Sequence, residues 1–146
     1  MNRERLRQTL KRHEGAVRIG GRHTVYKDSL GLETIGYGRL LSRGLSDDEA
    51  EYLLEKDITE CVRAAREYPW FAGLDDVRQE VIVNMIFNLG AARFSRFVKT
   101  HQAISRGDFE WAAREMLDSL WATQVRRRAN ELAEQMRRGD SSIPRG

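Results

Sequence analysis

The segment from Leu74 to Gly90 constrains the fold more than any other part of this chain. Apolar residues leave almost no polar face along it: Val77, Val81, Ile82, Val83, Met85, Ile86 and Phe87. A helix that is apolar on nearly every side is stable only when other elements surround it. Gly90 follows directly and is typical of a helix C-terminus. We therefore expect a buried central helix over about 74–89.

Amphipathic helices are expected on both sides of this buried helix. Leu6 and Leu10 lie four residues apart among charged residues and predict a short helix over about 2–13. Ser46-Asp47-Asp48-Glu49 is typical of a capping box and opens the longest expected helix, about 47–68. The remaining expected helices cover about 94–98, 100–105, 108–119 and 126–138.

Residues 17–38 differ from the rest because β-prone runs alternate with glycines. Val17-Arg18-Ile19 and His23-Thr24-Val25-Tyr26-Lys27 flank Gly20-Gly21, which predicts a β-hairpin. Residues 33–38 predict a third strand after a turn. We expect a small antiparallel sheet of about three strands. The fold class is therefore α+β, with a small sheet lobe joined by a long helix to a larger all-helical lobe.

Composition excludes several classes of protein. The chain of 146 residues has a formal charge of +3 and no apolar run long enough to span a bilayer. Its single cysteine, Cys61, excludes an intrachain disulfide, and its three scattered histidines do not indicate a zinc site. No nucleotide-binding motif is present, so we expect no metal and no cofactor. The charged N-terminus predicts that there is no signal peptide.

A carboxyl pair with a hydroxyl is the best candidate for chemistry. Glu14 is expected at the end of the first helix, Asp28 in a turn and Thr34 on the strand that follows. Glycoside hydrolysis needs one protonated carboxyl to protonate the leaving oxygen and a second carboxylate to activate water or attack carbon. Because acids in turns and helix ends are common in any soluble protein, spacing alone favours an ordinary structural role for these residues.

Ordered motifs strengthen the hydrolytic interpretation. His13-Glu14-Gly15, Tyr26-Lys27-Asp28 and Thr34-Ile35-Gly36-Tyr37-Gly38 occur in that order, and Asn84-Met85-Ile86-Phe87-Asn88-Leu89-Gly90 follows. This pattern resembles the phage lysozymes of the T-even type, which are peptidoglycan N-acetylmuramidases. The resemblance extends to about Gly139 and implies a single lysozyme-like domain, 1–139. It would comprise a β-rich lobe (about 14–55), a helical lobe (1–13 plus about 69–139) and a connecting helix (about 47–68), followed by a disordered tail, 140–146.

The resemblance also implies the activity and the catalytic roles. The family hydrolyses the β-1,4 bond between N-acetylmuramic acid and N-acetylglucosamine with inversion. By this likeness Glu14 is the general acid, while Asp28 and Thr34 hold the attacking water. For substrate binding, the likeness nominates Leu40, Phe87, Asn88, Ser119 and Gln124, although Leu40 and Phe87 could equally belong to a core.

Two departures from the family pattern generate further hypotheses. The interval from Glu14 to Asp28 is longer than in the family and centres on Gly20-Gly21, which indicates a longer hairpin. Arg39 stands where the family has a histidine that pairs with an aspartate, and Asp57 occupies the matching place, so an Arg39–Asp57 pair is expected. Arg128 fits the family arginine that supports the catalytic acid.

Other functions remain open from the sequence. A lytic transglycosylase would cleave the same bond without water, and the final arginine-rich helix could bind nucleic acid or weakly contact an anionic membrane. The leading interpretation is a monomeric endolysin that acts on peptidoglycan glycan strands, with no nucleic acid and no obligatory protein partner. It would accumulate in the host cytoplasm and need a holin to reach the wall in the periplasm.

Overall fold

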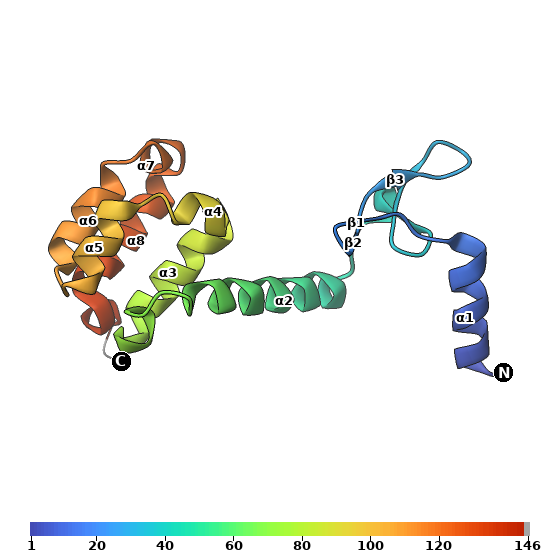
Figure 1. Ribbon diagram of the computed structural model, residues 1–146, viewed down its shortest axis with the longest axis horizontal. Helices are drawn as coiled ribbons and strands as arrows, with labels where there is room; N and C mark the ends of the chain where they lie inside the picture. Colours follow the sequence, from blue (N-terminus) through green and yellow to red (C-terminus); the bar gives the residue numbers. More distant parts are fainter. Residues whose placement is uncertain (145–146) are drawn as a thin grey trace. The chain divides into compact units, whose positions relative to one another are not determined.

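The computed structural model describes residues 1–144 and divides the chain into two compact units. The first unit is Met1–Glu51 and contains all the strands, and the second is Tyr52–Gly146 (Figure 1). The expected α+β class with a small antiparallel sheet region is therefore confirmed. The assignment of residues 1–13 to the helical lobe depends on how the two units pack against each other, so it stays a prediction.

The first unit opens with helix α1 (Arg3–Glu14), as expected. The Asn2 side chain accepts a hydrogen bond from the Arg5 backbone N–H and caps the helix start. Gly15, at φ +65°, ends the helix, and its N–H donates to the Lys11 carbonyl oxygen. The helix end therefore fixes where Glu14 leaves the backbone.

The strands form two small sheets rather than the single sheet that was expected. Strands β1 (Arg18–Ile19) and β2 (Arg22–His23) pair around Gly20-Gly21, which confirms the hairpin. The second sheet has the order β3-β4-β5, formed by β3 (Tyr26–Lys27), β4 (Glu33–Ile35) and β5 (Arg39–Leu40).

The prediction was wrong about strand continuity at two points. The run from His23 to Lys27 is interrupted at Thr24, whose N–H donates to the Val17 carbonyl oxygen, and then continues as a strand of the other sheet. The stretch 33–38 is a strand only to Ile35, because Gly36 and Gly38 both have positive φ and turn the chain back.

A single helix, α2 (Asp47–Ala65), follows the short 3-10 helix η1 (Leu41–Arg43) and carries the chain into the second unit. The predicted capping box is present, because the Glu49 N–H donates to Ser46 Oγ and the Ser46 hydroxyl donates to Glu49 Oε1. The helix ends three residues earlier than expected, and Arg66–Tyr68 form a turn before Pro69.

The regular elements of the second unit, within residues 52–144, are all helices. After the 3-10 helix η2 (Phe71–Gly73) this unit contains α3 (Asp76–Leu89), α4 (Ala91–Phe94), α5 (Val98–Ser105), α6 (Phe109–Leu117), α7 (Leu120–Gln124), α8 (Arg126–Arg138) and the 3-10 helix η3 (Gly139–Ser142). Helix α7 was missed by the sequence analysis because five residues are too short to show a helical period.

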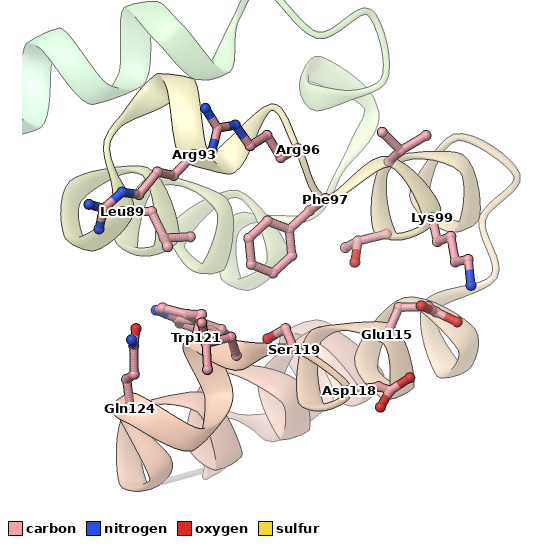
Figure 2. Close-up of a pocket in the computed structure, with 13 residues that line it drawn as sticks. Leu89, Arg93, Arg96, Phe97, Lys99, Glu115, Asp118, Ser119, Trp121 and Gln124 are labelled. Atoms are coloured by element: carbon pink, nitrogen blue, oxygen red, sulfur yellow. The ribbon is translucent and has the colours of Figure 1, made fainter.

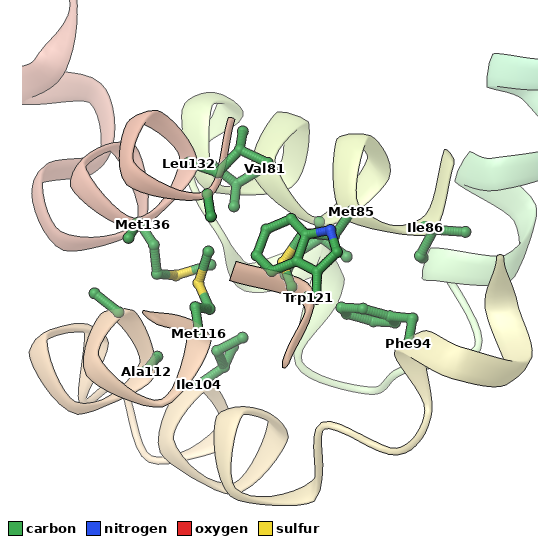
Figure 3. Close-up of a cluster of buried hydrophobic side chains, with 14 of the residues drawn as sticks. Val81, Met85, Ile86, Phe94, Ile104, Ala112, Met116, Trp121, Leu132 and Met136 are labelled. Atoms are coloured by element: carbon green, nitrogen blue, oxygen red, sulfur yellow. The ribbon is translucent and has the colours of Figure 1, made fainter. Parts of the chain in front are cut away.

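Helix α3 is the central element that its composition predicted. Val77, Val81, Ile82, Met85 and Ile86 are all buried on it. Figure 3 shows α3 side chains meeting those of α5, α6 and α8 around the Trp121 indole. Every buried hydrophobic side chain in the described residues belongs to the second unit. The apolar core of residues 1–144 therefore lies outside the sheet-containing unit.

The end of α8 is fixed by a polar clamp around Arg78. Its guanidinium donates to the Met136 and Arg137 carbonyl oxygens at 2.7 and 2.9 Å, and to Asp75 at 2.6 Å. The Asp140 carboxylate accepts from the Val77 N–H. Residues 140–142 therefore belong to η3 rather than to the expected disordered tail, and residues 145–146 lie outside the described part of the chain.

Residues 1–144 contain neither a membrane-spanning helix nor a cluster of metal-binding side chains. No helix among them is long and apolar enough to cross a membrane. No group of three or more histidine, cysteine, aspartate or glutamate side chains in this part of the chain is arranged to hold a metal ion.

Candidate active site

Glu14, the proposed acid, lies directly against a glycine of the β4–β5 turn. A Cβ atom added to Gly38 would fall 2.6 Å from Glu14 Oε2 and 2.8 Å from its carboxyl carbon. Gly38 also has φ +83°, a region that residues with side chains rarely adopt. Only glycine therefore allows the Glu14 side chain to pack here, a role that the sequence analysis did not assign to Gly38.

Asp28 closes the loop between β3 and β4. Its Oδ1 accepts from the backbone N–H groups of Leu30 and Leu32, both at 2.9 Å. An aspartate that bonds to amides a few residues ahead is typical of a tight turn. Asp28 Oδ2 makes no hydrogen bond within residues 1–144, so one carboxylate oxygen shapes the loop while the other is available to a ligand or water.

Thr34 lies in the middle strand of the three-stranded sheet and pairs with Tyr26 and Leu40. It is 1% exposed, and its hydroxyl donates to the Leu32 carbonyl oxygen at 2.9 Å. Because that hydroxyl has one proton, Thr34 can only accept a hydrogen bond from a water in this arrangement. Its role in holding water stays a prediction.

The backbone of Leu32 brings two of the candidates together. Its N–H donates to Asp28 and its carbonyl accepts from Thr34, so both side chains bond to one residue of the β3–β4 loop. Tyr26 pairs with Thr34 in the sheet, and Asp28 follows β3 directly, at the start of the β3–β4 loop. The three predicted catalytic residues all belong to the first unit.

Arg39 has two partners inside the first unit. It forms an ion pair with Glu49 and donates to the Gly44 carbonyl oxygen at 3.1 Å. Hydrogen bonds from Arg39 and then from Ser46 hold the pKa of Glu49 below its ordinary value. Asp57 lies beyond the unit boundary on α2, so the expected Arg39–Asp57 pair stays a prediction. The Arg39–Glu49 pair was not predicted from the sequence.

A pocket of about 710 Å³ in the second unit contains two of the predicted substrate-binding residues, Ser119 and Gln124. Figure 2 shows Phe97 and Trp121 in its interior. The two candidates differ in availability, because the Ser119 hydroxyl donates to the Met116 carbonyl oxygen and caps α7 through the Ala122 N–H. Gln124 is exposed and its side chain makes no hydrogen bond within residues 1–144, so it is the freer of the two.

The walls of this pocket carry opposite charges. Arg93, Arg96 and Lys99 line one side, and Glu115 and Asp118 line the other (Figure 2). None of these five side chains takes part in an ion pair within the described residues. The pocket is therefore suited to a ligand that carries polar or charged groups of both signs.

The other predicted substrate residues lie elsewhere. Asn88 Oδ1 accepts from the Trp121 indole N–H at 2.7 Å, so this amide supports the tryptophan. Phe87, 46% exposed, lines a second pocket of about 560 Å³, whose residues include Arg128. Leu40 is half-buried beside Thr34 in the sheet. Contact of Arg128 with Glu14 would cross from one unit to the other and stays a prediction.

Ion pairs on α8 bear on the nucleic-acid and membrane interpretations. Arg137 pairs with Glu110 and Glu134 at 2.7 and 2.6 Å, and Arg138 pairs with Glu134. The hydrogen bonds to Glu134 and then to Glu110 raise the pKa of Arg137. Because acidic partners neutralise this end of the helix, its arginines are less available to phosphate groups than their number suggests.

The chain is similar to a family model and to several known proteins, among them the following three. The model for phage lysozyme matches residues 11–139. Probable T4-type lysozyme 2 of Dictyostelium discoideum is 27% identical over 158 residues, covering 87% of this chain and 90% of that protein. Probable T4-type lysozyme 1 of the same organism is 26% identical over 144 residues, covering 77% and 85%. Pre-baseplate central spike protein Gp5 of Enterobacteria phage T4 is 26% identical over 157 residues, covering 87% of this chain and 26% of that protein.

Proposed function

This chain belongs to the phage lysozyme family and is a glycoside hydrolase of the lysozyme type, and from that premise we propose its bond, mechanism and biological role. It hydrolyses the β-1,4 bond between N-acetylmuramic acid and N-acetylglucosamine in bacterial peptidoglycan, with inversion, for host lysis. One observation carries the proposal: Glu14 packs on Gly38 in the same unit in which Asp28 and Thr34 meet at Leu32.

Each candidate has one chemical task in this mechanism. The Glu14 carboxyl gives its proton to the glycosidic oxygen as the bond to the anomeric carbon breaks. A water attacks that carbon from the opposite face, and the free oxygen of Asp28 takes its proton. A lone pair of Thr34 accepts the second hydrogen of the water and fixes its orientation. The products are the inverted hemiacetal and a free hydroxyl on the leaving sugar.

Two isosteric substitutions test the roles of the carboxyls. Glu14→Gln removes the acid, and Asp28→Asn removes the base while keeping an oxygen that can accept from Leu30 and Leu32. Each is expected to lower kcat by about 10²-fold or more, the usual contribution of a positioned acid or base. Glu33→Gln, on an exposed residue of β4, is the matched control and leaves kcat unchanged.

The product decides the reaction. Digested peptidoglycan should yield fragments that have gained one water, with a reducing N-acetylmuramic acid whose anomer is α when first released. An anhydro-muramic product would identify a lytic transglycosylase instead. Wild-type activity in Glu14→Gln would remove Glu14 as the acid.

Substrate contacts belong to the same proposal. Gln124 in the charged pocket and Leu40, Phe87, Asn88 and Ser119 contact the glycan strand. Because Gln124 is exposed and Ser119 caps α7, Gln124→Ala should raise KM by a few fold without lowering the melting temperature, whereas Ser119→Ala should also destabilise the helix by about 1 kcal/mol. An unchanged KM for Gln124→Ala would exclude this contact.

The cellular role is tested separately from the chemistry. We expect the protein to act as a monomer, to remain in the host cytoplasm and to reach the wall only through a holin. Expression with and without a pore-forming holin, followed by culture turbidity, measures this dependence. Lysis without the holin at the same rate would contradict it.

A further inference from the structure

Tyr37 supplies the single side chain of the Gly36–Gly38 turn. Gly36 and Gly38 both have positive φ, and Tyr37 stands between them. Glycine restrains the backbone less than any other residue, so a Gly-Tyr-Gly turn is not fixed by its own sterics. Since the Glu14 carboxylate packs on Gly38, a shift of this turn moves the surface that Glu14 lies on.

Residues of three other elements, β1, β2 and α1, hold the Tyr37 side chain. The Arg18 guanidinium donates to the Tyr37 hydroxyl at 3.1 Å, and the His23 ring meets the tyrosine ring edge-on at a centroid distance of 5.0 Å. The Lys11 ammonium lies 5.2 Å from the centre of the same ring. Lys11 belongs to the last turn of α1, whose final residue is Glu14.

The β1–β2 hairpin carries two of these groups, Arg18 and His23. Arg18 and His23 are directly paired across β1 and β2, and a guanidinium nitrogen of Arg18 lies 3.1 Å from His23 Nε2. Because a guanidinium can only donate, His23 Nε2 is the acceptor in this contact. One Arg18 nitrogen therefore serves both the imidazole and the tyrosine hydroxyl, and it connects the hairpin to the glycine turn.

From these contacts we propose that Tyr37 is a positioning residue for the Glu14 carboxyl and that the Arg18–His23 pair anchors it. Tyr37 holds the Gly36–Gly38 turn at a fixed place relative to the end of α1, so the Glu14 side chain keeps one orientation. The β1–β2 hairpin is then a functional addition to the catalytic unit. This inference rests on the proposed role of Glu14 as the acid.

The experiment compares kcat and KM on purified soluble glycan strands of peptidoglycan. Tyr37→Phe keeps the ring for Lys11 and His23 but loses the hydroxyl that Arg18 reaches, while Tyr37→Ala loses every contact. We expect kcat to fall about tenfold or more in Tyr37→Ala and by a few fold in Tyr37→Phe, with KM unchanged, because small displacements of a catalytic group are costly. Tyr52→Phe and Tyr52→Ala are the matched controls, since Lys56 lies over that exposed ring too.

A double-substitution cycle tests whether Arg18 acts through the hydroxyl. Arg18→Met should lower kcat as much as Tyr37→Phe does, and the pair together should lower it no further. Arg18→Lys keeps a donor and should restore part of the loss, whereas Arg43→Met, on an exposed arginine of η1, should have no effect. Additive losses from Arg18→Met and Tyr37→Phe would overturn the anchoring role.

Two further outcomes would contradict the positioning role of Tyr37. A rise in KM with unchanged kcat would make Tyr37 a substrate contact, and a loss of activity that matches the loss of folded protein by circular dichroism would make it purely structural. Either result overturns the proposal. Glu14→Gln is measured first: if it keeps activity, the role of Glu14 fails, and if it is inactive while the Tyr37 variants equal wild type, only this inference fails.

Discussion

Replacing Arg78 by methionine should cost the second unit a large part of its stability. The Arg78 side chain is 15% exposed, its guanidinium donates to two carbonyls in the last turn of α8 and to Asp75, and its Cζ atom lies 3.7 Å from the centre of the Phe109 ring. Methionine keeps much of the packing but none of the donors. Counting the lost hydrogen bonds at about 1 kcal/mol each and the ring contact at about 1 kcal/mol, we expect about 3–4 kcal/mol of destabilisation.

Urea unfolding followed by tryptophan fluorescence measures this loss. Trp70, Trp111 and Trp121 all lie in the second unit, so the signal reports the unit that contains the clamp. Arg78→Lys keeps one cationic donor and should lose about half as much, because an ammonium cannot reach both carbonyls in the guanidinium geometry. Arg114→Met, on an exposed arginine that pairs with Glu110, is the matched control and should lose less than about 0.5 kcal/mol.

Lowering the pH should reduce the difference in free energy of unfolding between wild type and Arg78→Met. Burial favours a higher pKa for Asp75, but the hydrogen bonds from the Arg78 backbone and guanidinium together hold it below its ordinary value of 3.8. The stability that comes from this lowered pKa is present above 3.8 and is lost as the pH falls through the folded-state pKa. A destabilisation by Arg78→Met below about 1 kcal/mol at neutral pH would refute the clamp, given the hydrogen bonds counted here.

Three further predictions concern single residues. Burial lowers the pKa of His101, and the hydrogen bond with the Phe94 carbonyl opposes this shift more weakly. The stability of the wild type should therefore fall as the pH drops from 6.5 toward the folded-state pKa. The urea midpoint of His101→Phe should not fall over the same pH range. Gly38→Ala should cost about 1–2 kcal/mol in backbone strain, and it should lower kcat because the added Cβ displaces Glu14. Gly73→Ala is the control, since it lies at an open position without positive φ and should keep full activity. Ser46→Ala should lower the melting temperature by a few degrees, the effect of losing a helix cap worth about 1 kcal/mol.

The long helices could be predicted from the sequence because their signals are local. Ser46 with its acid three residues later and Asp108 after a glycine mark helix starts, and the structure places caps at both. The strands could not be bounded as well. Most are two residues long, which is too short to show alternation, and their pairing depends on hydrogen bonds such as that from Thr24 to Val17.

The candidate site residues stand in sequence motifs, but their contacts could not be predicted from those motifs. Glu14, Asp28 and Thr34 stand in motifs, and the structure places all three in one unit. The packing of Glu14 on Gly38 joins residues far apart in sequence, so no local pattern reveals it. Arg39 is an example: its charge predicts an acidic partner, but the sequence does not show that this partner is Glu49 of the α2 capping box.

The uneven distribution of buried apolar side chains makes the two halves of the chain differ in how easily they open. The second unit holds every buried hydrophobic residue of the described chain, whereas the unit with Glu14 relies on short ladders and polar contacts. Amide protons of β3 to β5 should therefore exchange with deuterium much sooner than those of α3. A glycan that bridges Asp28 and Glu14 would slow this exchange, so part of its binding energy would be used to order the unit that holds these two residues.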